Sequence, residues 1–245
     1  MLKSFFSISS LGKCRVGITG ATGSLGLELI KSLKEEGAFV IGLTHKEPPK
    51  DIPSENSPQE WVRWQCGEEK SLESTLSKLD ILILNHGINT KGRNSFKDLD
   101  TSIEVNALSS WRLIEIFKNI SIKSSSKNIQ REIWVNTSEA EIQPALSPSY
   151  EISKRLIGEL VSITRNSLNK EEKELLKIRK LILGPFKSEL NPIGLMNAKF
   201  VANQIIFLAK LNISLIIVTP NPLTYIIMPV FELARFFYYQ ITKRE

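Results

Sequence analysis

Cysteine and histidine are scarce in this chain of 245 residues, which has only Cys14, Cys66, His45 and His86. Two distant cysteines form no disulfide framework, and neither residue type has the spacing of a metal site. This usage suits a reducing compartment, so we expect a cytoplasmic protein without a bound metal. No uninterrupted apolar run reaches the roughly 18 residues of a spanning helix, and the apolar patch near the start is too short for a signal peptide.

An excess of charge of one sign is also nearly lacking. Lysine and arginine number 32 against 26 acidic residues, which gives a net charge of +6 and a pI near 9.2. The basic residues are scattered, with no stripe interleaved with aromatics, so we expect no nucleic-acid partner. The remaining excess could favour anionic ligands or a membrane surface. With 42% hydrophobic residues, the chain fits one large α/β domain over residues 1–245.

Short apolar runs separated by helical patterns define the expected fold. Nearly continuous β-branched runs are typical of parallel strands covered on both faces. Helical spacing between them is clearest at Leu25, Leu29 and Leu33. The sequence therefore predicts an α/β fold, a doubly wound parallel sheet of about seven strands in three α/β/α layers, the Rossmann arrangement. The expected strands are 15–19, 38–43, 61–65, 80–84, 131–137, 178–183 and 214–218.

Two polar segments, 46–60 and 121–130, are expected to be exposed connections. The first carries four prolines and has no hydrophobic period, and the second is rich in serine.

A glycine-rich turn, TGATGSLG, follows the first expected strand. Such a turn lets backbone amides approach a pyrophosphate without a Cβ in the way, and the following helix supplies partial positive charge. Placed after the first strand of an α/β pattern, it favours dinucleotide binding over a merely tight turn. The residues expected to bind the cofactor here are Gly20, Thr22, Gly23, Ser24, Leu25 and Gly26.

The end of the second expected strand bears on the choice of cofactor. An acidic residue there would bind the ribose hydroxyls and repel a 2′-phosphate. This chain has Thr44, His45 and Lys46 instead, which favours NADP, with NAD as the alternative. A solvated loop with an incidental lysine explains these residues nearly as well.

Tyr150 and Lys154 lie four residues apart, a spacing that places both on one face of a helix. An ammonium close to a phenol favours the phenolate and lowers its pKa, so the tyrosine can exchange a proton with an alcohol or carbonyl. Ser138, at the end of the fifth expected strand, could hold the substrate oxygen.

These pieces stand in the order of a known family. The chain resembles the short-chain dehydrogenase/reductases over roughly residues 14–220. The matching motifs are TGATGSLG, NHG at 85–87, VN at 105–106, NTS at 136–138, YEISK at 150–154 and LGPFKSEL at 183–190.

The resemblance implies roles for individual residues. Tyr150 would be the general acid/base, Lys154 would contact the nicotinamide ribose and tune Tyr150, and Asn106 would hold a proton-relay water. The remaining expected cofactor contacts are Asn85, His86, Gly87, Gly184, Pro185 and Ser188. The resemblance also implies a homodimer or homotetramer, with helices at about 101–118 and 150–167 in the interface.

The chain departs from the family's common pattern in several places. The glycine spacing resembles the extended branch, which includes nucleotide-sugar epimerases, although the C-terminal region is short for that branch. Aligned on Asn136, the family's catalytic serine falls at Glu139; aligned on Tyr150, it falls at Ser138, with Thr137 in reserve. Glu68 could replace the family's acidic residue near the adenine.

The final segment, 221–245, is apolar nearly all round. A helix buried against the body or a second subunit is the first interpretation. A helix lying on a lipid surface, and a wall of an apolar substrate pocket, are the other two. Either of the last two would make the substrate lipophilic, and the lipid-surface helix would make the protein peripheral to a membrane. The chain is also similar to dehydrogenase modules found linked to sterol-desaturase-like membrane domains.

Together these features predict an enzyme that transfers hydride between NADP(H) and a carbonyl or alcohol of a small, lipophilic molecule. Ser138, Tyr150, Lys154 and Asn106 are the expected catalytic residues. The alternatives are an enzyme like the nucleotide-sugar epimerases and dehydratases, and a non-catalytic sensor that binds a dinucleotide.

Overall fold

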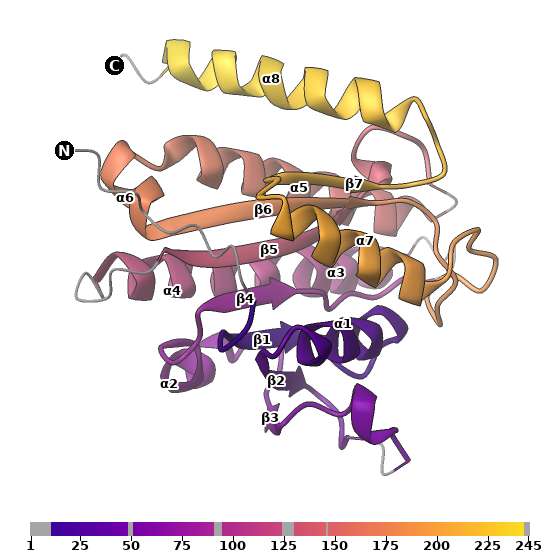
Figure 1. The fold of residues 1–245 in the computed structure, drawn as a ribbon. Coiled ribbons are helices and arrows are strands. Elements are labelled where there is room, and N and C mark those ends of the chain that lie inside the picture. Colours follow the sequence, from indigo (N-terminus) through magenta and orange to yellow (C-terminus); the bar gives the residue numbers. More distant parts are fainter. Residues whose placement is uncertain (1–10, 49–50, 91–94, 124–129, 146, 243–245) are drawn as a thin grey trace.

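A seven-stranded parallel sheet forms the centre of the protein, seen in a computed structural model that describes residues 11–48, 51–90, 95–123, 130–145 and 147–242. The strand order is β3-β2-β1-β4-β5-β6-β7 (Figure 1). Each neighbouring pair is parallel. The strands are β1 (Arg15–Thr19), β2 (Phe39–Thr44), β3 (Glu60–Arg63), β4 (Ile81–Leu84), β5 (Arg131–Ser138), β6 (Leu176–Leu183) and β7 (Leu215–Val218).

All seven strands lie where the sequence predicts them, with ends that differ by one or two residues. The predicted fold class is confirmed. β6 begins at Leu176, earlier than expected, because Leu176 and Lys177 continue its pairing with Arg131 and Glu132 of β5.

Helices cover both faces of the sheet, as the three-layer prediction requires. α1 and α7 pack together on one face, and α4 and α5 lie on the other (Figure 1). The helices are α1 (Ser24–Glu35), α2 (Glu73–Leu76), α3 (Phe96–Ile103), α4 (Ser109–Lys123), α5 (Pro148–Ser167), α6 (Lys170–Leu175), α7 (Ala198–Lys210) and α8 (Thr224–Thr242). Short 3-10 turns are η1 (Ser54–Asn56), η2 (Glu69–Leu72) and η4 (Glu139–Glu141), and η3 (Glu104–Leu108) is a π-helical turn.

The two expected connections are partly structured. Residues 46–60 contain η1 and end on the first residue of β3. Helix α4 extends to Lys123, so residues 121–123 of the expected loop 121–130 are helical, and 124–129 lie outside the described residues.

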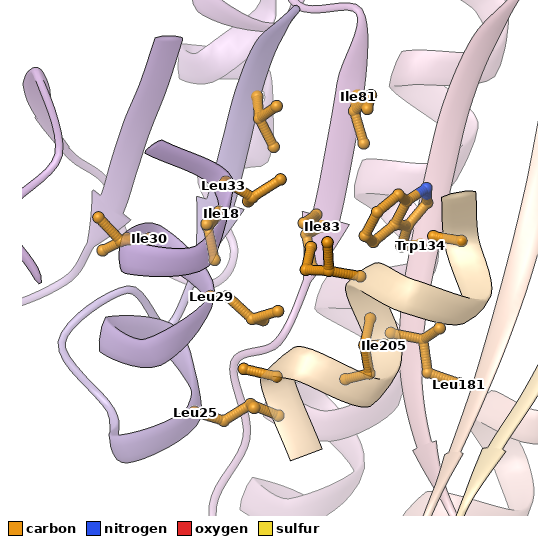
Figure 2. Packing of buried hydrophobic residues seen from close by; sticks show 14 of the residues in the cluster. Ile18, Leu25, Leu29, Ile30, Leu33, Ile81, Ile83, Trp134, Leu181 and Ile205 are labelled. Atoms are coloured by element: carbon orange, nitrogen blue, oxygen red, sulfur yellow. The ribbon is translucent and has the colours of Figure 1, made fainter. Parts of the chain in front are cut away.

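Successive side chains along each strand point to opposite faces of the sheet, so the buried residues form two clusters, one on each face. One face packs Ile18, Ile83 and Trp134 against Leu29 of α1 and Ile205 of α7 (Figure 2). The other face packs alternate strand residues against α2, α4 and α5. Since both faces of nearly every strand are buried, the strands read as continuous apolar runs rather than alternating ones.

The last helix, α8, packs along α5 and the outer strands. Met228 contacts Ile182 and Ile217, but among the residues of α8 only Thr224 and Met228 are buried. The single chain therefore leaves most of α8 exposed, and burial of this helix against a second subunit stays a prediction. No helix within the described ranges is long and apolar enough to cross a membrane.

Strand order reverses direction between β1 and β4, which lie side by side at the centre of the sheet. The loops that leave β1 and β4 turn to opposite faces at such a point, and a crevice opens between them at the carboxyl ends of the strands. Figure 1 shows these ends on one side of the molecule.

The core cluster around α1 gives a stability prediction. Leu29 is almost completely buried, so Leu29→Ala removes packing that its neighbours cannot fully restore. We expect the free energy of unfolding to fall by about 2–5 kcal/mol in urea denaturation. The matched change Leu211→Ala, on an exposed residue after α7, is expected to cost less than about 0.5 kcal/mol. Equal losses in the two variants would contradict this account of the core.

Candidate active site

A cleft of about 590 Å³ opens at the carboxyl ends of the strands. It extends from the glycine turn after β1 to the start of α5. Most of the residues predicted from the sequence lie in its lining: Gly20, Thr22, Gly23, Ser24, Leu25, His45, Lys46, Asn85, His86, Gly87, Ser138, Tyr150, Lys154, Gly184, Pro185 and Ser188.

The glycine turn has the shape that a pyrophosphate needs. Gly20 has φ +61°, and a Cβ there would lie 2.8 Å from the Cα of His86. Helix α1 starts at Ser24, without a side-chain cap from Gly23 and without an acidic residue in its first turn. Its first amide groups are therefore available for an anion, and the helix dipole favours one.

Gly26 and Thr44 are predicted contacts that lie outside this lining. A Cβ on Gly26 would come within 2.4 Å of the Gly20 carbonyl oxygen, so this glycine lets α1 pack against the turn. The Thr44 hydroxyl is buried and accepts a hydrogen bond from the Lys46 amide at 3.2 Å. Gly26 and Thr44 thus contact residues that line the cleft and do not line it themselves.

Among the described residues that line the end of the cleft beside β2, none carries a carboxylate. Leu43, His45, Lys46, Trp64 and Cys66 line it. Glu68, the expected substitute for the family's acidic residue, is not in the lining. Trp64 and Cys66, which also follow β3, line the cleft there instead.

A chain of hydrogen bonds joins the strand ends beneath the cleft. The Thr19 hydroxyl accepts from the Asn85 amide at 2.9 Å. The Asn136 side chain donates to the Asn85 side-chain oxygen at 3.0 Å, and Lys154 Nζ donates to the Asn136 carbonyl at 3.2 Å. These hydrogen bonds connect the ends of β1, β4 and β5 to one another and to α5.

The predicted catalytic group assembles at the end of this chain of hydrogen bonds. The side chains of Tyr150 and Ser138 are hydrogen-bonded, and Lys154 Nζ lies 5.8 Å from the centroid of the Tyr150 ring. The reserve candidate, Thr137, donates its hydroxyl to the Leu181 carbonyl at 3.1 Å. Of the two hydroxyl candidates for the serine position, Ser138 is the one hydrogen-bonded to Tyr150.

The electrostatics of Tyr150 differ from the expectation. Burial raises its pKa and outweighs the hydrogen bond from Ser138, while the nearby charge of Glu139 raises it further. The net shift of the pKa of Tyr150 is thus upward, opposite to the predicted direction. Lys154 itself is affected, because burial lowers the pKa of its amine to about 8, and the charge of Glu141 opposes that shift.

His86 occupies the wall between the two ends of the cleft. Its Nδ1 lies 2.8 Å from the Thr19 hydroxyl, and its ring packs edge-on against Trp64 with centroids 5.2 Å apart. Burial, and then the charge of Lys154, lower the pKa of His86 to about 4. Its imidazole is therefore neutral at pH 7, and its expected contact with the cofactor stays a prediction.

Asn106 lies behind the lining, within the π-helical turn η3. Its side chain accepts from the Ile88 amide at 2.7 Å and donates to the Ile88 carbonyl at 3.0 Å and to Ser153 at 2.9 Å. It fixes the segment that follows β4 against α5. Its expected role with a relay water stays a prediction.

Glu139 is a cleft residue whose environment sequence analysis missed. Its Oε2 accepts hydrogen bonds from Thr219 at 2.6 Å and from Thr224 at 3.3 Å, and it lines the cleft beside Tyr150. The signal in the sequence was its place at the alternative serine position, but its partners lie far along the chain.

Solved structures that share this fold are mostly short-chain dehydrogenase/reductases. A short chain dehydrogenase from Burkholderia cenocepacia, solved with NADP, matches with TM-score 0.74 and 17% identity over 90% of this chain and 93% of that chain. A putative 2-deoxy-d-gluconate 3-dehydrogenase from Agrobacterium tumefaciens, with bound NADP, matches with TM-score 0.72 and 16% identity over 88% and 98% of the two chains.

Sequence comparison then gives the family. Residues 16–166 match the NAD dependent epimerase/dehydratase family, so the chain belongs to that family. A curated relative, monoglucosyldiacylglycerol epimerase from Synechocystis, is 40% identical over 228 residues, which are 92% of this chain. The match spans 54% of the length of that relative.

The lowered pKa of Lys154 gives a pH-dependent prediction. Between about pH 8 and pH 10 the unfolded lysine holds a proton that the folded one has lost, so stability contributed by this group rises with pH. We expect the unfolding free energy of the wild type to gain roughly 2–3 kcal/mol over Lys154→Met across this range. Urea denaturation at several pH values measures it. Lys78→Met, on an exposed side chain before β4, is the control and should follow the wild-type profile. A constant difference between wild type and Lys154→Met would contradict the assignment.

Proposed function

We propose that the chain is an NAD(P)-dependent enzyme that oxidises and re-reduces a hydroxyl-bearing carbon of a lipid-linked sugar, as an epimerase. The observation that carries the proposal is the hydrogen-bonded Tyr150–Ser138 pair beside Lys154, in a cleft whose other end is a glycine turn. The relative named for a glucosylated diacylglycerol supports the substrate class.

The residues at the catalytic end supply proton transfer and orientation. Ser138 would hold the substrate oxygen by its hydroxyl, and the phenol of Tyr150 would take the hydroxyl proton during oxidation and return it during reduction. Burial keeps Tyr150 protonated in this structure, which is the form needed to donate to a ketone oxygen. Lys154 would favour the phenolate when the proton leaves.

The residues around the glycine turn fit a dinucleotide. The amides at the start of α1 and the tight turn through Gly20 and Gly23 suit a pyrophosphate, and His45 with Lys46 suits the phosphate of NADP. The nicotinamide, when bound, would accept and return the hydride.

A dehydrogenase that releases the ketone is the second candidate, supported by the fold. The two activities differ in the cofactor balance. A dehydrogenase accumulates reduced cofactor in proportion to product, whereas an epimerase converts the sugar with no net change. Incubation of the protein with monoglucosyldiacylglycerol and NAD(P)⁺ distinguishes them by absorbance of the reduced nicotinamide and by chromatography of the sugar.

Tyr150→Phe tests the catalytic assignment. Removing the phenol oxygen removes the proton donor and leaves the glycine turn intact, so we expect turnover to fall by about a hundredfold to ten-thousandfold with cofactor affinity retained. Turnover assays and calorimetric titration with NADPH measure the two effects. Full turnover in the variant would refute the role of Tyr150. Absent turnover in both proteins, with cofactor still bound, would favour a non-catalytic sensor.

Lys46→Glu tests the cofactor preference. A carboxylate at this place repels a 2′-phosphate, so we expect NADPH binding to weaken by about tenfold or more while NADH binding changes little. Thermal denaturation with each cofactor reports this, since about 100 times the Kd adds about 2.7 kcal/mol of stability. Lys78→Glu, an exposed lysine at the opposite ends of the strands, is the matched control. If Lys46→Glu kept the wild-type preference between NADPH and NADH, residues other than Lys46 would determine the choice of cofactor.

A further inference from the structure

The outer face of α8 is apolar, although it is exposed. Between Thr224 and Thr242 the helix has only two charged residues, Glu232 and Arg235, and both are turned toward the body. The outward stripe consists of five residues that are each between 55% and 73% exposed. Their spacing of three or four places them on one side of the helix. They are Ile226, Val230, Leu233, Phe237 and Ile241.

A helix on the surface of a water-soluble domain turns its apolar face inward and its charged face outward. In α8 the two faces have the opposite orientation. The charges hold the helix in that orientation. Glu232 Oε1 accepts from Lys180 Nζ at 2.9 Å and from Ser162 at 2.8 Å, and Arg235 pairs with Glu159 at 2.7 Å. Lys180 is completely buried, so a rotation of α8 would remove one of its carboxylate partners.

The stripe begins at the rim of the cleft. Thr224, the first residue of α8, donates its hydroxyl to Glu139, which lines the cleft beside Tyr150. Across the opening, the segment between β6 and α7 exposes Ile193 and Leu195, and its neighbour Leu190 also lines the cleft. Figure 1 shows this segment and the start of α8 at the same end of the sheet. Exposed apolar side chains therefore flank the place where a substrate enters.

We propose that the outward stripe of α8 is a membrane-contact surface that seats the protein on a bilayer with its cleft opening toward the headgroups. The stripe would enter the interfacial region of the lipid, where apolar and aromatic side chains are stabilised. A bilayer explains both the inverted pattern and its continuity with the cleft, because a lipid-linked sugar could then pass from the membrane into the site. The direction of substrate entry rests on the proposed function; the contact surface does not.

A flotation experiment tests the surface with a matched pair of variants. Phe237 on the stripe and Phe207 on α7, in the layer that covers the other face of the sheet, are both 56% exposed. We expect the wild-type protein and Phe207→Glu to float with vesicles of phosphatidylcholine and phosphatidylglycerol. Phe237→Glu is expected to bind these vesicles at least about tenfold more weakly, since it places a charge in the apolar contact. Circular dichroism and NADPH binding check that both variants are folded.

Other outcomes would overturn the proposal. These are a wild-type protein that does not bind vesicles, equal weakening in both variants, and vesicle binding unaffected by Phe237→Glu. Concentration-dependent self-association that Phe237→Glu abolishes, without vesicle binding, would assign the stripe to a second copy of the chain instead.

A further comparison separates this proposal from the proposed function. Tyr150→Phe should bind vesicles as the wild type does. Phe237→Glu should turn over a detergent-dispersed glucosyl lipid normally but lose at least about tenfold in rate on the same lipid in vesicles. Absent turnover in every protein, with the vesicle results as expected, would refute the enzyme assignment and leave the membrane surface standing. Equal rates of wild type and Phe237→Glu on vesicles would overturn the role of the stripe in substrate entry.

Discussion

The line of hydrogen bonds from Thr19 through Asn85 and Asn136 to Lys154 is the contact on which the site depends. Parallel strands bring their carboxyl ends to one edge, but they do not by themselves fix the loops that leave them. Here polar side chains at those ends bind one another rather than water. The glycine turn, the end of β4 and the first turn of α5 therefore keep one relative position, and the two ends of the cleft are spaced by protein contacts.

Buried charge connects the catalytic end to α8. Glu141 lies 2.6 Å from Lys180 and also opposes the desolvation of Lys154. Lys180 in turn binds Glu232 of α8 at 2.9 Å. The same carboxylate thus contributes to the protonation of a predicted catalytic lysine and to the group of charges that holds the last helix. A change that neutralises Glu141 would therefore affect both the protonation of Lys154 and the ion pairs that hold α8.

The sequence allowed the fold and most of the cleft to be predicted, because the relevant signals are local. Runs such as 131–137 mark strands buried on both faces, and TGATGSLG marks a turn that the backbone must make. Gly26 and Thr44 were assigned to the lining because a motif does not show which of its residues point outward. The pKa of Tyr150 was misjudged because burial depends on the complete packing. Glu139 binds Thr219 and Thr224, which lie about 80 residues further along the chain, so no local pattern in the sequence relates them.

The π-helical turn η3 between α3 and α4 has a consequence for how this chain can vary. Its wider loop places one additional residue in an otherwise continuous helix, which changes the angular phase between the segments before and after it. Asn106 can then face Ile88 and Ser153 while Phe117, farther along, still faces the sheet. A π-helical turn holds one more residue than an α-helical turn, so losing a single residue there would leave an ordinary helical turn without the bulge. The helix would remain continuous, but Asn106 would lose the position from which it binds Ile88 and Ser153.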